Sequence, residues 1–106
     1  MNIREWQKAA WQNSEDHGFH EPNPNIPERL ALVHSEVSEA LEDFRDGKMT
    51  TIVRADGKPE GFPSELADVI IRVFDLGESL GIDLQTEIEM KHEHNKTRPF
   101  KHGKIC

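Results

Sequence analysis

Two pairs of acidic residues have a spacing that suits them to metal chemistry. Glu36 and Glu39 form the first pair, and Glu65 and Asp68 form the second, each separated by three positions. In a helix this spacing places both side chains on one face, a single turn apart. Four acids that a fold brings together repel one another unless a cation with oxygen ligands lies between them. The alternative interpretation is that both pairs are ordinary solvated helix faces.

The ligand types favour one kind of metal. A site built from carboxylate oxygens alone is typical of Mg²⁺, with Mn²⁺ as a substitute. Di-iron carboxylate bundles also use inward-facing acids, but they add a Glu-x-x-His pair, and neither acidic pair here contains histidine. The histidines elsewhere in the chain lack the further cysteine or histidine ligands that would complete a zinc site. We therefore expect structural or solvent-exposed roles for His17, His20, His92 and His94.

Length and composition limit the classes of protein. The 106 residues correspond to one domain, and we expect a single domain over residues 1–106. The formal net charge of −7 argues against a nonspecific binder of nucleic acid polymers. No apolar run reaches the length of a membrane span, and the N-terminal residues do not resemble a signal peptide. Cys106 is the single cysteine, which fits a reducing, cytoplasmic setting.

Hydrophobic periodicity and capping signals predict an all-α fold with four helices. The segment from Lys48 to Phe62 is expected to form a short hairpin or an irregular excursion, because β-branched residues precede an Asp-Gly turn signal. The four helices are expected over Ile3 to about Asp16, Pro27 to Arg45, a segment capped by Ser64 that ends before Gly81, and a segment capped by Asp83 that ends near Lys96.

The third of these helices is apolar on most of its circumference. Ile70, Ile71 and Phe74 lie on different sides of it, whereas Glu65 and Asp68 lie on its narrow polar strip. Three other helices in a small domain do not cover so much apolar surface. We therefore expect a homodimer or homotetramer. If the second and third helices pack antiparallel, the two acidic pairs can face each other.

The ordered motifs of the chain resemble those of the MazG-like all-α nucleoside triphosphate pyrophosphohydrolases, which share a four-helix metal site with the dimeric dUTPases. The E-x-x-E motif is Glu36-Val37-Ser38-Glu39, and the E-x-x-D motif is Glu65-Leu66-Ala67-Asp68, followed by apolar Val69-Ile70-Ile71. The third element is Lys91-x-x-x-Asn95-x-x-Arg98-Pro99. These three motifs cover about residues 30 to 100 in the order typical of the family.

The resemblance implies a four-helix MazG-like bundle that uses Mg²⁺ to hydrolyse a nucleoside triphosphate to the monophosphate and pyrophosphate. House-cleaning of noncanonical or excess deoxynucleotides fits such a protein. Glu36, Glu39, Glu65 and Asp68 are the expected metal ligands. Glu39 is also our candidate for the general base, because it points further from the apolar stripe than Glu36 does.

Four further residues are candidates for substrate binding. Lys91 and Asn95 share one helix face and can hold phosphate oxygens or the sugar, and Arg98 can clamp a phosphate. Trp11 is offset from the apolar face of its helix, so it can stack on a nucleobase, or equally cap the core or an interface. Two other classes stay open: a non-catalytic helical interaction module that kept the fold, and a di-iron carboxylate protein.

Overall fold

The computed structural model describes residues 1–99 and confirms an all-α fold with one small hairpin. The basic segment that follows Pro99, including Lys101 and Cys106, lies outside the described residues. The elements are α1 (Ile3–Asp16), α2 (Ile26–Arg45), β1 (Ile52–Val53), β2 (Pro59–Glu60), α3 (Phe62–Ser79) and α4 (Leu84–Lys96). The two short strands pair antiparallel, with Ile52 opposite Glu60, so the hairpin interpretation of this segment is confirmed.

Side-chain caps explain where three of the helices begin. Asn2 and Glu5 form a reciprocal capping box at the start of α1. The side chain of Asn25 accepts from the Glu28 backbone at the start of α2. Asp83 accepts from the Thr86 backbone at 3.2 Å, which confirms it as the N-cap of α4.

The cap predicted for α3 is wrong. This helix begins at Phe62, and its N-cap is Gly61 rather than Ser64. Gly61 has a φ of 112°, and a Cβ at this position would lie 2.2 Å from the carbonyl oxygen of Thr50. Glycine therefore permits the close approach of the hairpin to the start of α3. Ser64 lies in the first turn, where its hydroxyl donates to the carbonyl of Pro59.

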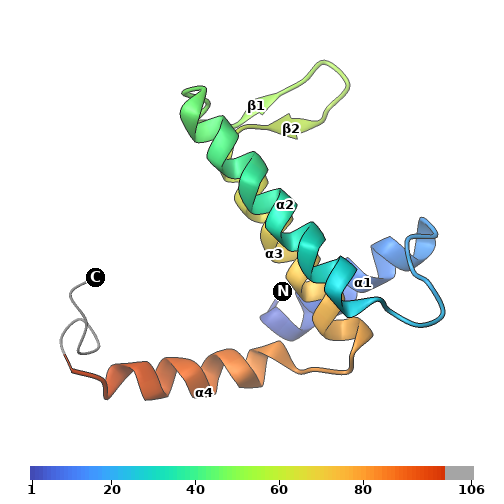
Figure 1. Cartoon of the computed structure of the whole chain (residues 1–106), viewed down its shortest axis with the longest axis vertical. Helices are drawn as coiled ribbons and strands as arrows, with labels where there is room; N and C mark the ends of the chain where they lie inside the picture. The colour runs from blue at the N-terminus through green and yellow to red at the C-terminus, as the bar shows by residue number, and fades with distance from the viewer. Residues whose placement is uncertain (100–106) are drawn as a thin grey trace.

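The pairing of α2 with α3 is the main packing contact of the chain. The two helices run antiparallel, with the hairpin at one end of the pair (Figure 1). Helix α1 packs on α3 near the other end, whereas α4 projects away from the pair (Figure 1). The described residues of one chain therefore form a three-helix unit with a projecting fourth helix, and not a closed four-helix bundle.

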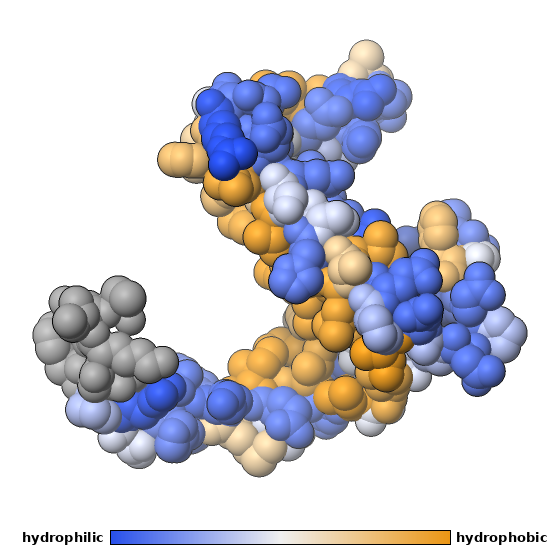
Figure 2. All heavy atoms as spheres, viewed as in Figure 1, coloured by the Kyte–Doolittle hydropathy of each residue, from blue (hydrophilic) through white to orange (hydrophobic). Residues whose placement is uncertain are grey.

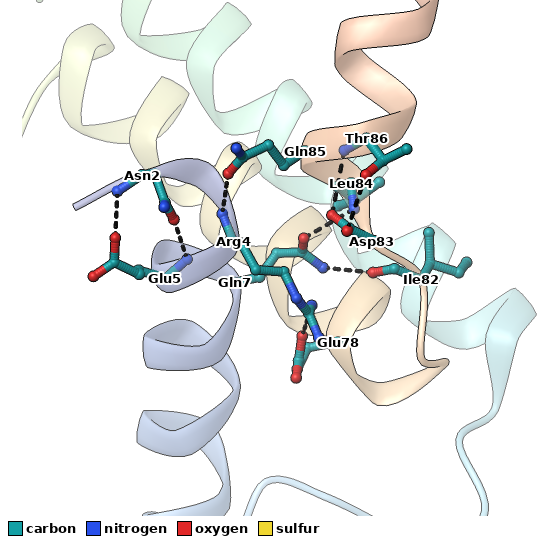
Figure 3. Close-up of polar contacts among 10 residues, drawn as sticks. All are labelled: Asn2, Arg4, Glu5, Gln7, Glu78, Ile82, Asp83, Leu84, Gln85 and Thr86. Carbon is teal, nitrogen blue, oxygen red and sulfur yellow. Dashed lines mark hydrogen bonds and ion pairs between the residues drawn. The ribbon is translucent and has the colours of Figure 1, made fainter.

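A buried glutamine fixes the start of α4. Gln7 is fully buried, its amide nitrogen donates to the Ile82 carbonyl at 2.8 Å, and its amide oxygen accepts from Leu84 N–H at 2.9 Å (Figure 3). Both ends of the amide are thus satisfied by the turn between α3 and α4. Gly77 leaves room for this contact, since a Cβ there would lie 2.7 Å from Leu84 Cδ1. Arg4 adds an ion pair with Glu78.

The apolar core of the described residues is small. Ala40 and Leu76 are its buried hydrophobic residues, whereas many large side chains remain exposed. The accessible surface is 8083 Å², against about 6,000 Å² for a typical monomer of 12.2 kDa. The radius of gyration is 16.2 Å, against about 13 Å for a compact chain of this length. Hydrophobic residues line the inner side of the bend between the α2–α3 pair and α4 (Figure 2).

Within residues 1–99, none of the helices combines the length and the apolar character that a bilayer crossing requires.

Candidate metal centre

Three of the four predicted acids come together where α2 and α3 pair. Glu36 of α2 and Glu65 and Asp68 of α3 each place a carboxylate oxygen within 4.8 Å of the others. Antiparallel packing brings the two motifs to the same level, as the sequence led us to expect. Glu36 is buried, Glu65 is half-buried and Asp68 is exposed, so the group opens to solvent on one side.

The fourth acid, Glu39, lies one turn further along α2 and is exposed. It does not belong to the group of three whose oxygens converge within 4.8 Å. It lies beside Glu65, where its hydrogen bonding and its charge raise the pKa of that residue. Glu39 is therefore an exposed neighbour of Glu65 that lies outside the group of three converging acids.

Burial and neighbouring acids perturb Glu65 strongly. Desolvation is the largest cause that raises the pKa of Glu65 from 4.5 to about 7, followed by Glu39 and the charges of Asp68 and Glu36. Glu65 Oε2 is a buried oxygen without a hydrogen-bond partner among the described residues. Two ionised carboxylates are both acceptors, so a hydrogen bond between Glu39 and Glu65 requires a proton on one of them. This oxygen thus needs either a proton or a cation.

Two basic residues that were not predicted as part of the site act on these acids. Arg72 Nε donates to Glu36 Oε1 at 2.7 Å. Burial and Glu36 raise the pKa of Asp68, while Arg72 and Lys58 oppose that rise. The spacing of four between Asp68 and Arg72 on one strip of α3 was a usable signal for Arg72. Lys58 belongs to the hairpin, and nothing in its local sequence relates it to α3.

An open cavity of about 370 Å³ adjoins the acids. Within residues 1–99, its walls come from the end of α1, the following segment, α2 and α3, and none comes from α4. It contains both cationic and apolar groups, so it suits a ligand with an anionic part and a flat or apolar part. Its lining residues are Ser14, Phe19, Arg29, Leu32, Glu36, Asp68, Ile71, Arg72 and Asp75.

Trp11 lies in a neighbouring cavity of about 440 Å³ rather than against the acids. Its ring stacks on His20, with centroids 5.2 Å apart and planes at 26°. His20 contacts Glu15 Oε2 through Nδ1 and Asp75 Oδ1 through Nε2, each at 2.7 Å. Burial alone would lower the pKa of His20, but these two carboxylates raise it above its ordinary value. Arg29 Nη2 lies 3.1 Å from Asp75 Oδ2 and forms a wall shared by the two cavities.

The three α4 candidates lie together but apart from the acids of the same chain. Lys91 and Asn95 line a shallow cavity of about 360 Å³ on α4 with Ile88. Arg98 Nη1 lies 3.5 Å from Asn95 Oδ1. Because α4 projects from the α2–α3 pair (Figure 1), these side chains do not border the acid-lined cavity within one chain.

The donor set fits a hard divalent cation. Carboxylate oxygens from two helices converge, one buried oxygen lacks a hydrogen-bond partner among the described residues, and solvent reaches the open side, where water could supply further oxygen ligands. Among the described residues, the group contains no histidine or cysteine, so it does not have the ligands that zinc usually takes. Comparison of the chain with protein-family models, curated proteins and solved structures finds no match.

Proposed function

We propose that this chain is a Mg²⁺-dependent nucleoside triphosphate pyrophosphohydrolase of the MazG-like kind, with Mn²⁺ as a substitute cation. The reaction is hydrolysis of a (deoxy)nucleoside triphosphate to the monophosphate and pyrophosphate, in a house-cleaning role. The observation that carries the proposal is the convergence of Glu36, Glu65 and Asp68 from two antiparallel helices. It is accompanied by a buried oxygen of Glu65 that has no hydrogen-bond partner among the described residues.

The residues divide the chemistry between them. A divalent cation bound at such a site neutralises charge on the phosphates and makes water more acidic. In this proposal Glu36, Glu65 and Asp68, whose carboxylate oxygens converge, hold the cation, and the exposed side chain of Glu39 accepts a proton from water. The adjoining cavity of about 370 Å³ suits part of a nucleotide, because it combines the cationic side chain of Arg72 with the apolar side chain of Ile71.

The α4 candidates fit this function if a second copy supplies them. Lys91 and Arg98 would then bind phosphate oxygens and Asn95 the sugar, across an interface between chains. The surplus surface of the chain supports assembly, since 8083 Å² exceeds the typical monomer value by about 2,000 Å². Burial of that amount per chain is within the range of obligate homodimers. We therefore propose a homodimer or homotetramer in which the helices of two copies close a four-helix bundle.

The test is a nucleotide panel incubated with Mg²⁺ and analysed for pyrophosphate against orthophosphate. Pyrophosphate with a matching amount of monophosphate supports the proposal, whereas orthophosphate indicates cleavage at a different bond. Asp68→Asn should abolish the pyrophosphate signal, because it removes a carboxylate from the cation site. Asp56→Asn is the matched control, since Asp56 is an exposed hairpin residue paired with Arg54. Equal activity of Asp68→Asn and the wild-type protein would show that the acids are not the metal site.

A non-catalytic helical interaction module is the second candidate, favoured by the extensive exposed apolar surface (Figure 2). Exposed apolar surface of this extent marks an interaction site. A module without activity would assemble or bind a partner but release no pyrophosphate from any nucleotide. The same panel therefore separates the two functions.

A further inference from the structure

Arg72 lies at the boundary between the acids and the adjoining cavity. It follows Asp68 by four positions on α3 and lines the cavity of about 370 Å³. Its Nε donates to Glu36 Oε1 at 2.7 Å. The side chain of Glu36 is 11% exposed, whereas that of Arg72 is 42% exposed. The guanidinium therefore neutralises a buried carboxylate from the solvent side of the site.

This ion pair places Arg72 in competition with a divalent cation. A cation bound by the three acids needs an oxygen of Glu36, which is the carboxylate that Arg72 holds. A guanidinium and a divalent cation a few ångströms apart also repel each other. Binding of the cation thus weakens the hold of Glu36 on Arg72.

The cavity gives Arg72 an alternative partner. Arg29, the other arginine that lines the cavity, forms an ion pair with Asp75, with 3.1 Å between Nη2 and Oδ2, although this buried nitrogen has no hydrogen-bond partner among the described residues. Arg72 is the more exposed of the two, at 42% against 19% for Arg29. Its planar guanidinium can bind two oxygens of a phosphate at once. A phosphate in this cavity would give Arg72 a new anionic partner in place of the Glu36 carboxylate.

We propose that Arg72 is an exchangeable internal counter-ion of the metal centre, which the divalent cation displaces from Glu36 and which then binds a phosphate of the nucleotide in the adjoining cavity. This inference rests on the proposed function and deepens it, because it couples the two ligands of the same site. Arg72 lowers the affinity of the acids for the cation alone and raises the affinity of the loaded protein for the nucleotide.

The test measures two affinities whose expected changes have opposite signs. Mn²⁺ binding without nucleotide is measured on the full chain by isothermal titration calorimetry and by electron paramagnetic resonance. Arg72→Gln should bind Mn²⁺ about five- to tenfold more tightly than the wild-type protein, within the usual range of coupling between sites. At saturating Mn²⁺, the same variant should bind a nonhydrolysable α,β-methylene nucleoside triphosphate about tenfold more weakly, because a charged phosphate contact is lost.

A merely structural role predicts another pattern. If Arg72 only held Glu36 in place, Arg72→Gln would weaken the binding of both Mn²⁺ and the nucleotide analogue. Arg54→Gln is the matched control, because Arg54 pairs with exposed Asp56 and Glu60 on the hairpin. It should leave both affinities unchanged. If Arg72→Gln does not fold, Arg72→Met keeps the apolar stem without the charge, and the same two changes are expected.

Three failures are distinguishable. Mn²⁺ binding by a folded Arg72 variant that equals or falls below that of the wild-type protein overturns the counter-ion inference and leaves the proposed function standing. Unchanged binding of the analogue by that variant overturns the assignment of phosphate to Arg72. Absence of Mn²⁺ binding by the wild-type protein would instead overturn the metal centre itself, and the inference with it.

Discussion

Glu65→Gln should stabilise the protein above pH 7 when no divalent cation is added. Folding raises the pKa of Glu65 from 4.5 to about 7, through desolvation and the charges of its neighbours. A carboxyl group whose pKa is raised stabilises the fold most below pH 4.5, and this contribution is lost as the pH rises through 7. At about 1.4 kcal/mol per pKa unit, the loss is at most about 3.5 kcal/mol, and it is smaller where solvent screens the charge of this half-buried group. Glutamine removes this charge and can donate to the neighbouring Glu39.

The assay is thermal unfolding of the chelator-treated protein between pH 5 and pH 8.5, followed by circular dichroism. We expect Glu65→Gln to raise the free energy of unfolding at pH 8 by about 1 to 3 kcal/mol, which corresponds to a Tm increase of at least about 4 °C. The wild-type protein should lose stability as the pH rises across this range, and the variant should lose less. Mn²⁺ should stabilise the wild-type protein far more than the variant.

The control for this experiment is Glu42→Gln, because Glu42 is exposed on α2 and lies 3.8 Å from Arg45. Its removal should change the Tm by less than about 2 °C. A Glu65→Gln variant that is less stable than the wild-type protein at pH 8 without metal would refute the reasoning. That result would show that Glu65 is already compensated and that its site has no need of a cation.

Three further outcomes follow from the same structure. His20→Ala should reduce the free energy of unfolding at pH 6 more than at pH 9, as measured by urea unfolding at the two pH values. Folding raises the pKa of His20, so its stabilising contribution is present below the pKa of the unfolded chain and is lost as the pH rises through the pKa of the folded protein. Lys91→Ala should lower kcat/KM for every nucleotide by a similar factor, while Trp11→Ala should change the ranking of bases; a Lys91→Ala variant with altered base preference and unchanged efficiency would reverse these assignments. Multi-angle light scattering at micromolar concentration should give at least twice the 12.2 kDa of one chain, and an active monomer would contradict the proposed assembly.

Much of the local structure could be predicted from the sequence, because the signals for it are local. The bounds of α1 and the start of α4 at Asp83 are as predicted, since caps and helical periodicity are written in neighbouring residues. Ser64 shows the limit of such signals. It has a good capping side chain, but the helix begins earlier, because the hairpin brings Thr50 against Gly61 and the positive φ of that glycine turns the chain.

The sequence by itself determined which residues could form a metal site, because helical spacing puts Glu36 with Glu39 and Glu65 with Asp68. Only the tertiary structure decided that Glu36 joins Glu65 and Asp68 while Glu39 stays on the solvent side. It also decided that Arg72 pairs with Glu36 and that Lys91 lies away from the acids of its own chain. The physical reason is the separation in sequence between the residues that make each contact. Periodicity fixes the face on which a side chain lies, whereas the depth and level at which two helices pack depend on contacts that are distant in the sequence.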